Sequence, residues 1–466
     1  MNPGRAAAGV RNDRRSPSDA FWGRVLAVAT LAVWAYGLVG GFRTAILWLT
    51  FIGMGAAVAG LFQPALGLLG VGMLCTLDAA ARVYILTGGL LRWNTFNFIL
   101  MAVALIFVRR LAVVKEAPAR LAVLLLLFLT FGLLFTADRL HGIQHLTGLV
   151  SFFGILVYCL RAGRAEVWYW TAVVSGLIGA CGGFVFNLQK SDLPFINPNA
   201  WSYFPLTAIL IICIALSFKV NSRGSTLVVL AAVNGAWAFL SGSRGAILVA
   251  CMCAVYIVLA TRGIGSKLLL FGGVAVAILL TFQFAGQSDY ARKRIEKLLS
   301  TTEPLANRTS GRSELMLGAW YMFQEHPFGV GTGGFTRAWE RMTFVPGFSY
   351  FEIGEDMAAH SAWAKVLAEN GFIGFALLTG FVGSFAYVGW QRKGAGLLPI
   401  GVFTSLVLAS AFTNTEFQGK GLWLLSAATV VLLRDGGRRA SRAGGLSPRR
   451  PLPATALPGV QERRVG

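Results

Sequence analysis

Long apolar runs separated by short polar linkers dominate the pattern of hydrophobic and polar positions. Fourteen runs can be drawn, and the longer ones approach the roughly 20 apolar residues that a membrane-spanning helix needs. Several are shorter, so neighbouring runs could pair, and the pattern predicts an all-α, polytopic membrane protein with 12 to 14 spans. The runs cover 25–41, 44–62, 65–81, 95–108, 121–136, 146–160, 167–186, 206–218, 226–242, 247–261, 268–286, 372–390, 397–415 and 421–433.

Composition supports this prediction and excludes other classes. Hydrophobic residues make up 56% of the 466 positions and charged residues only 13%, whereas a soluble domain carries roughly 25% charged residues. A disordered chain, a collagen-like fibre and an ordinary soluble globule are therefore excluded.

The net charge of +21 is unevenly distributed. Arginines crowd both ends of the chain, as in segments that stay on the cytoplasmic side of a membrane. No basic motif alternates with stacking aromatic residues, so nucleic acid is not an expected partner. We predict a basic cytoplasmic tail, a helix bundle, a loop on the opposite side, C-terminal spans and a basic disordered cytoplasmic tail, at 1–24, 25–286, 287–361, 362–433 and 434–466.

The linkers agree with this orientation, since clusters of Lys and Arg fall on every second one. The other linkers carry isolated positive charges, including Arg82, Lys190 and Arg244. The orientation rule does not explain these residues, which suggests another role for them. The longest linker, 287–361, also lies on that side. After Gly311, apolar residues recur in it at helical spacing, so part of this loop is predicted to fold as a helix.

Three of the four histidines suggest little chemistry. His141 and His145 are four residues apart, as zinc ligands on a helix are, but the glutamate of the H-E-x-x-H motif and a third ligand are missing. No metal site is predicted. His326 lies in the glycine-rich run EHPFGVGTGGF, which is typical of a turn that packs the loop against the membrane part.

His360 is the candidate catalytic residue. It directly precedes Ser361, which can cap the following helix, and Gly371 is expected to end that helix. The imidazole would thus be held at a helix start near the membrane surface. Imidazole is the usual general base near neutral pH. The alternative is a histidine with a purely structural role.

Five cationic residues are candidates for binding an anion. Arg244 lies in FLSGSRGAIL, and Arg308 and Arg312 lie in ANRTSGRSELM. A guanidinium group binds phosphate through two parallel hydrogen bonds. The alternative is an arginine at a helix end that only extends its charged group to the membrane–water interface. Lys190 and Arg82 are weaker candidates, since a pair with Asp78 four residues earlier would explain Arg82.

No nucleotide-binding or hydrolase motif accompanies these residues. Walker A, Rossmann and G-x-S-x-G patterns and Asp-rich metal motifs are missing from the sequence. Neither a cofactor nor ATP-driven transport is therefore predicted. Secondary transport stays open as an alternative.

The segments SGSRGAIL, NRTSGRSELM…AW…HPFGVGTGGF and AHSAWAKVLAENGFIG resemble the bacterial O-antigen ligase and polymerase superfamily, in the order expected for that family. His360 and Gly371 meet its H-x10-G pattern. The resemblance covers about 230–420. It implies a GT-C-like architecture with about 12 spans, in the inner membrane of a Gram-negative bacterium, with both tails cytoplasmic and the large loop periplasmic.

The resemblance also implies a function. Members are metal-independent, inverting glycosyltransferases whose donor is a glycan on undecaprenyl pyrophosphate. Ligases pass it to the lipid A–core oligosaccharide, and polymerases pass it to another lipid-linked repeat. By motif, His360 corresponds to the essential histidine, and Arg244 with Arg308, Arg312 or both to the essential arginines. Membrane lipids would surround the protein. The favoured hypothesis is an O-antigen ligase. The alternatives are a polymerase of O-antigen or exopolysaccharide, and a lipid or polysaccharide transporter.

Overall fold

The computed structural model describes the residues that form the helices and the turns between most of them. They are 17–78, 94–189, 198–218, 224–241, 244–260, 311–342, 359, 361–391 and 420–444, with isolated positions between 264 and 279. Every regular element within these ranges is a helix. The prediction of an all-α protein is confirmed for this part of the chain.

The helices follow the predicted apolar runs closely. They are α1 (Pro17–Gly40), α2 (Phe42–Ala59), α3 (Pro64–Asp78), α5 (Asn94–Ile106), α6 (Val108–Leu111), α7 (Ala117–Gly132), α8 (Arg139–Ala162), α9 (Ala165–Gln189), α10 (Pro198–Ser217), α11 (Gly224–Leu240), α12 (Arg244–Ala260), α16 (Arg312–Glu325), α17 (Phe335–Glu340), α18 (Ala362–Gln391) and α20 (Lys420–Gly444). The runs at 268–286 and 397–415 lie outside the described elements.

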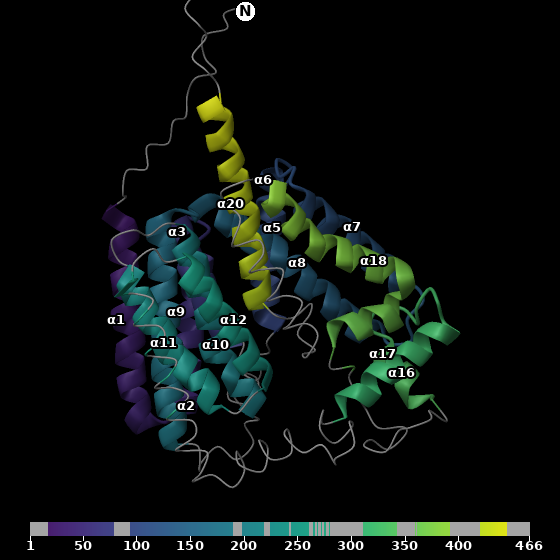
Figure 1. Cartoon of the computed structure of the whole chain (residues 1–466), viewed down its shortest axis with the longest axis horizontal. Coiled ribbons are helices and arrows are strands. Elements are labelled where there is room, and N and C mark those ends of the chain that lie inside the picture. The colour runs from purple at the N-terminus through teal and green to yellow at the C-terminus, as the bar shows by residue number, and fades with distance from the viewer. Residues whose placement is uncertain are drawn as a thin grey trace, which may run out of the picture.

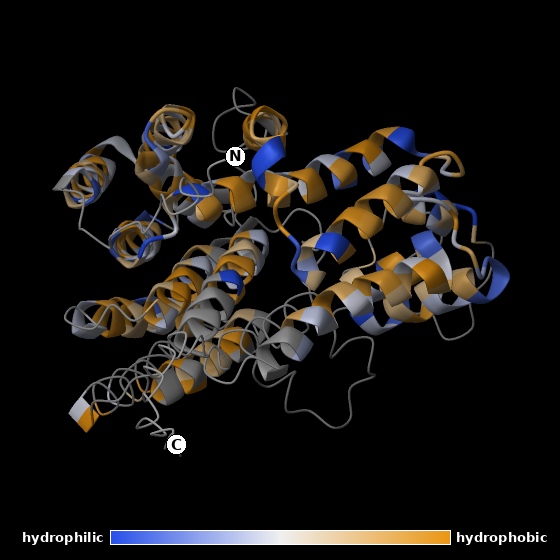
Figure 2. Cartoon of the chain, turned by 90° about the horizontal axis from the view of Figure 1, so that it is seen from above, coloured by the Kyte–Doolittle hydropathy of each residue, from blue (hydrophilic) through white to orange (hydrophobic). Residues whose placement is uncertain are grey.

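Five helices are long and apolar enough to cross a membrane, by length and composition: α1, α2, α8, α9 and α18. Several shorter helices are equally apolar but hold fewer than 18 residues, so they do not by themselves add to that number. Figure 2 shows that hydrophobic residues, in orange, make up much of the helices that the structure describes. Together these features indicate an integral membrane protein.

The outward faces of the helices carry large apolar side chains. Val28 and Val39 of α1 are 66% and 91% exposed, and Leu127 of α7 is 61% exposed. Many other large apolar side chains of these helices are exposed as well, Phe21 and Leu38 of α1 and Leu134 after α7 among them. A helix that is apolar all round fits a bilayer, where lipid tails cover the outer face.

The helices form two groups that lie side by side in Figure 1. One contains α1, α2, α3 and α9 to α12; the other contains α5, α7, α8, α18 and α20. They are joined where α3 packs on α8 and α10 packs on α20. Helix α1 begins and α20 ends at the upper end of Figure 1, whereas α16 and α17 lie at its lower end.

Helices α1 and α20 extend from their apolar runs into the segments expected as tails. Helix α1 begins at Pro17, inside the segment expected as a tail, and the buried Asp19 of its first turn pairs with Arg164 at 3.0 Å. Helix α20 continues to Gly444, past the end of the apolar run at 433. Hydropathy locates a span, but Arg and Ala are good helix formers and extend a helix after the apolar pattern stops.

Candidate functional site

The structure describes the surroundings of the predicted site better than its side chains. His360, Arg308, Lys190 and Arg82 lie outside the described residues, and Arg244 is described only as the first residue of α12. Arg312 is the first residue of α16.

Helix α16 is the helix predicted within the long loop, which confirms that part of this loop is folded. Gly311 precedes it with φ 76°, a left-handed backbone that suits glycine. Its inner face buries Leu315, Ala319 and Met322, which pack in one cluster with Phe335 and Trp339 of α17. Arg312 thus starts a helix that is anchored by its own apolar face.

The residues on both sides of position 360 are fully enclosed. Ala359 and Ser361 are 0% and 1% exposed. The Ser361 hydroxyl accepts from the Ala364 amide at 3.4 Å, and its carbonyl accepts from the Lys365 amide at 2.9 Å. The predicted cap of α18 is confirmed. Ala359 also shares the buried cluster of Leu315, so the start of α18 and the first turns of α16 belong to one packing unit.

The glycine-rich run after His326 forms a tight connection that we call the glycine loop, residues 327–334. The amides of Val330 and Gly331 donate to the carbonyls of Ala368 and Glu369 at 3.0 and 2.8 Å. On its other side, the Thr332 amide donates to the carbonyl of Gly132 at 3.3 Å. The loop therefore joins α18 to the turn between α7 and α8, in keeping with the structural role predicted for this run.

Side chains reinforce the same junction. The Thr332 hydroxyl lies 2.9 Å from the carbonyl of Leu129 and 2.8 Å from Oδ1 of Asn370. A hydroxyl carries one proton and can donate it to only one acceptor. Donation to Leu129, with the Asn370 amide turned so that Nδ2 donates to the hydroxyl, satisfies both buried groups.

Helix α18 breaks at Gly371, where the helix was expected to end. Gly371 has φ 60° and ψ −161° between two helical stretches. The break lets the Phe372 amide donate to the carbonyl of Pro327 at 3.2 Å, outside the helix. The first part of α18 is thereby held against the glycine loop, and the second part continues as an apolar span.

Comparison with known proteins identifies the segment that carries these elements. Residues 226–379 match the O-antigen ligase family. The resemblance to the O-antigen ligase and polymerase superfamily is thus confirmed, over a range somewhat shorter than predicted. No curated protein matches the chain. The segment of this chain that matches the O-antigen ligase family includes α12, α16, α17 and the kink of α18. It also includes every candidate residue except Lys190 and Arg82.

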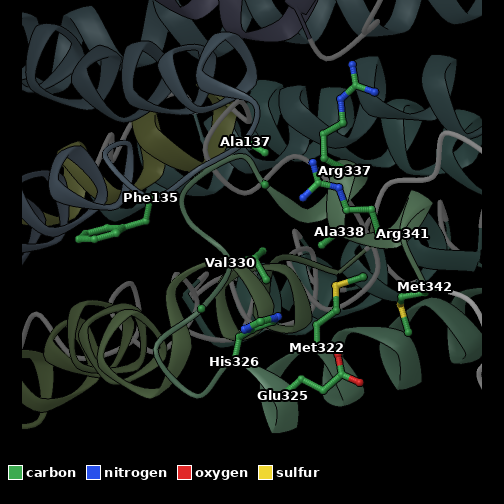
Figure 3. Close-up of a pocket in the computed structure, with 12 residues that line it drawn as sticks. Phe135, Ala137, Met322, Glu325, His326, Val330, Arg337, Ala338, Arg341 and Met342 are labelled. Atoms are coloured by element: carbon green, nitrogen blue, oxygen red, sulfur yellow. The ribbon is translucent and has the colours of Figure 1, made fainter.

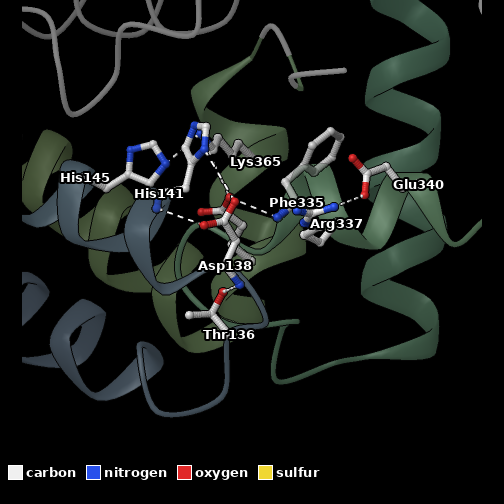
Figure 4. Close-up of polar contacts among 9 residues, drawn as sticks. Thr136, Asp138, His141, His145, Phe335, Arg337, Glu340 and Lys365 are labelled. Atoms are coloured by element: carbon white, nitrogen blue, oxygen red, sulfur yellow. Dashed lines mark hydrogen bonds and ion pairs between the residues drawn. The ribbon is translucent and has the colours of Figure 1, made fainter. Parts of the chain in front are cut away.

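Helix α8, outside the O-antigen ligase segment, contributes a buried polar contact to it. Nε2 of His145 lies 2.9 Å from Nζ of Lys365 on α18. Glu369, one turn further, has Oε1 at 3.9 Å from the same nitrogen and accepts from the Phe335 amide at 3.2 Å. The ammonium donates to the neutral imidazole, so the ring proton of His145 is on Nδ1. Figure 4 shows this network beside His141 and Asp138, which form a 3.7 Å pair.

Sequence reasoning missed this network. Ala362 and Val366 are buried, as their apolar character predicts, and Trp363 and Leu367 are partly buried. Lys365 and Glu369 are buried as well, at 6% and 1% exposed. The one available signal was the i,i+4 spacing of this Lys and Glu in an otherwise apolar helix. His145, considered as a metal ligand, faces a cation. Among the described side chains no three potential ligands gather at one point.

Proposed function

We propose that this protein is an O-antigen ligase: a metal-independent, inverting glycosyltransferase that moves O-antigen polysaccharide from undecaprenyl pyrophosphate to the lipid A–core oligosaccharide. The observation that carries the proposal is the family match over 226–379, which contains Arg244, Arg308, Arg312 and His360 in the order of the family motifs. The common packing of the starts of α16 and α18 supports a site shared by Arg312 and His360.

The proposed transfer reaction uses a general base and cationic groups that stabilise the leaving pyrophosphate. His360 takes the proton of the acceptor hydroxyl, whose oxygen attacks the anomeric carbon from the face opposite the leaving group. The bond from that carbon to the pyrophosphate oxygen breaks, and undecaprenyl pyrophosphate leaves with the electron pair. Negative charge grows on the pyrophosphate, and Arg244, Arg308 and Arg312 stabilise it by bidentate hydrogen bonds. Lys190 and Arg82 are weaker candidates for the same anion.

The proposed setting is the periplasmic face of the inner membrane, with about 12 spans in a GT-C-like arrangement and both tails cytoplasmic. The beginning of α1 and the end of α20 lie at one end of the molecule and α16 and α17 at the other, which supports this orientation. Apolar outer faces suit bound lipid chains of both substrates.

A deletion strain of the native bacterium tests the acceptor. Lipopolysaccharide gels that show rough core, with polymerised glycan accumulating on its lipid carrier, would support the ligase. Core capped by a single repeat would instead identify an O-antigen polymerase, which uses the same donor chemistry. Unchanged lipopolysaccharide would point to an exopolysaccharide. Transfer by the purified protein separates all of these from a transporter.

A further inference from the structure

A pocket of about 430 Å³ lies between α16, α17 and the turn that joins α7 to α8. Ligand sites in proteins typically measure about 300–1,000 Å³. Two regions far apart in the sequence line it: the turn at 135–137, and the stretch 322–342, which runs from the end of α16 through the glycine loop to the end of α17. Figure 3 shows the lining side chains around the pocket.

The charged groups of the pocket are divided between two sides. Arg337 and Arg341 are four residues apart at the end of α17, and Figure 3 shows them on the side opposite Glu325 and His326. Arg337 is oriented by Glu340, whose Oε2 lies 2.8 Å from Nη1. Guanidinium groups bind carboxylates and phosphates through paired hydrogen bonds. A ligand with one anionic end and several hydroxyl groups suits this division.

The remaining walls are apolar and held in place. Val330 and Met342 offer carbon and sulfur surfaces to a ligand. The backbone at Val330 is fixed by its hydrogen bond to the carbonyl of Ala368. A sugar ring has apolar C–H faces and a polar rim of hydroxyls, so it can use both kinds of wall at once. A preformed pocket also lowers the entropic cost of binding.

We propose that this pocket binds an acidic saccharide, that is, a sugar bearing a carboxylate or a phosphate. The anionic group lies at Arg337 and Arg341, and the hydroxyls point toward His326 and Glu325. Arg312, a candidate for the pyrophosphate, is at the opposite end of α16, and this 14-residue helix spans about 20 Å. The pocket is therefore a separate subsite. Only its assignment to a sugar of the glycan substrates rests on the proposed function.

Binding is tested without transfer, by saturation-transfer difference NMR on the full-length protein in detergent. The probes are glucuronate, glucose 6-phosphate and uncharged glucose. We expect binding of at least one acid, with glucose weaker. Arg341→Gln should raise the Kd of that acid at least about tenfold, the effect of one lost charge-assisted contact, without changing the response to glucose. Arg43→Gln, at an exposed arginine of α2, is the matched control and should bind as wild type.

Preference for one acid identifies the anionic group as carboxylate or phosphate. Equal binding of glucose and both acids, no binding of any probe, or unchanged acid binding by Arg341→Gln would overturn the proposal. Arg341 is exposed, so the variant should fold, and an unchanged Tm verifies this. His360→Ala should bind the acid normally. Normal binding without transfer by the wild-type protein would contradict the proposed function and leave the subsite standing.

Discussion

Replacing Gly371 by alanine tests the junction between α18 and the glycine loop. The backbone at φ 60° and ψ −161° lies in a region that is essentially restricted to glycine, which costs another residue about 1–3 kcal/mol. An added Cβ would also lie 2.1 Å from the carbonyl oxygen of Pro327 and 2.5 Å from the carbonyl carbon of Phe328. Both are backbone atoms, so no side-chain rotation relieves the clash, and overpacking adds about 1–3 kcal/mol.

The sum is about 2–6 kcal/mol of lost stability, a large part of the 5–15 kcal/mol typical of native proteins. We expect Gly371→Ala to lower the apparent Tm of the purified protein in detergent by about 2–6 °C, measured by intrinsic fluorescence, because in a chain of 466 residues a loss of 1 kcal/mol shifts Tm by about 1 °C. Gly383→Ala on the same helix is the control, because a Cβ there meets nothing within 4 Å. It should leave Tm unchanged or raise it slightly. A Gly371→Ala protein as stable as wild type would refute this account of the kink.

The remaining predictions concern the proposed reaction and the buried network. His360→Ala should reduce transfer by about 10²–10⁴, as loss of a general base does, while the protein still inserts and folds; wild-type transfer in vitro would exclude the assignment. Arg244→Lys, Arg308→Lys and Arg312→Lys should each impair donor consumption, because lysine keeps the charge but loses the planar fork; a lysine variant with full activity marks that arginine as structural. Transfer should proceed in EDTA without ATP, and a strict need for Mg²⁺ or Mn²⁺ would contradict the mechanism. Lys365→Met should cost about 3–5 kcal/mol, since it leaves a buried carboxylate without its cation; an unchanged Tm would show that this pair carries no stability.

The sequence predicts those features of the fold that depend on neighbours along the chain. Apolar runs locate the helices, helical spacing after Gly311 locates α16, and the Ser361 cap and the break at Gly371 are set by local backbone chemistry. Helix ends are less predictable. Helix α20 continues through an arginine-rich stretch because hydropathy and helix formation have different causes.

The contacts that assemble the site cannot be predicted in this way. Thr332 meets the carbonyl of Leu129 across 203 residues, and Lys365 meets His145 across 220. Neither pair leaves a periodic signal, since each residue alone is compatible with a solvated position. A lysine and a glutamate on an apolar helix predict an exposed stripe. Here α7 and α16 pack on that helix and His145 of α8 contacts Lys365, so both side chains are buried.

These long-range contacts mean that the segment matching the O-antigen ligase family is not a complete structural unit. The glycine loop within it hydrogen-bonds to Gly132, which ends α7, and α18 holds His145 of α8. Both helices precede the matched residues 226–379. The hydrophobic N-terminal half, which carries no family motif, therefore supplies the surface on which the loop and the start of α18 are fixed. Since position 360 directly precedes that start, the geometry of the proposed catalytic histidine depends on helices that the family motifs do not include.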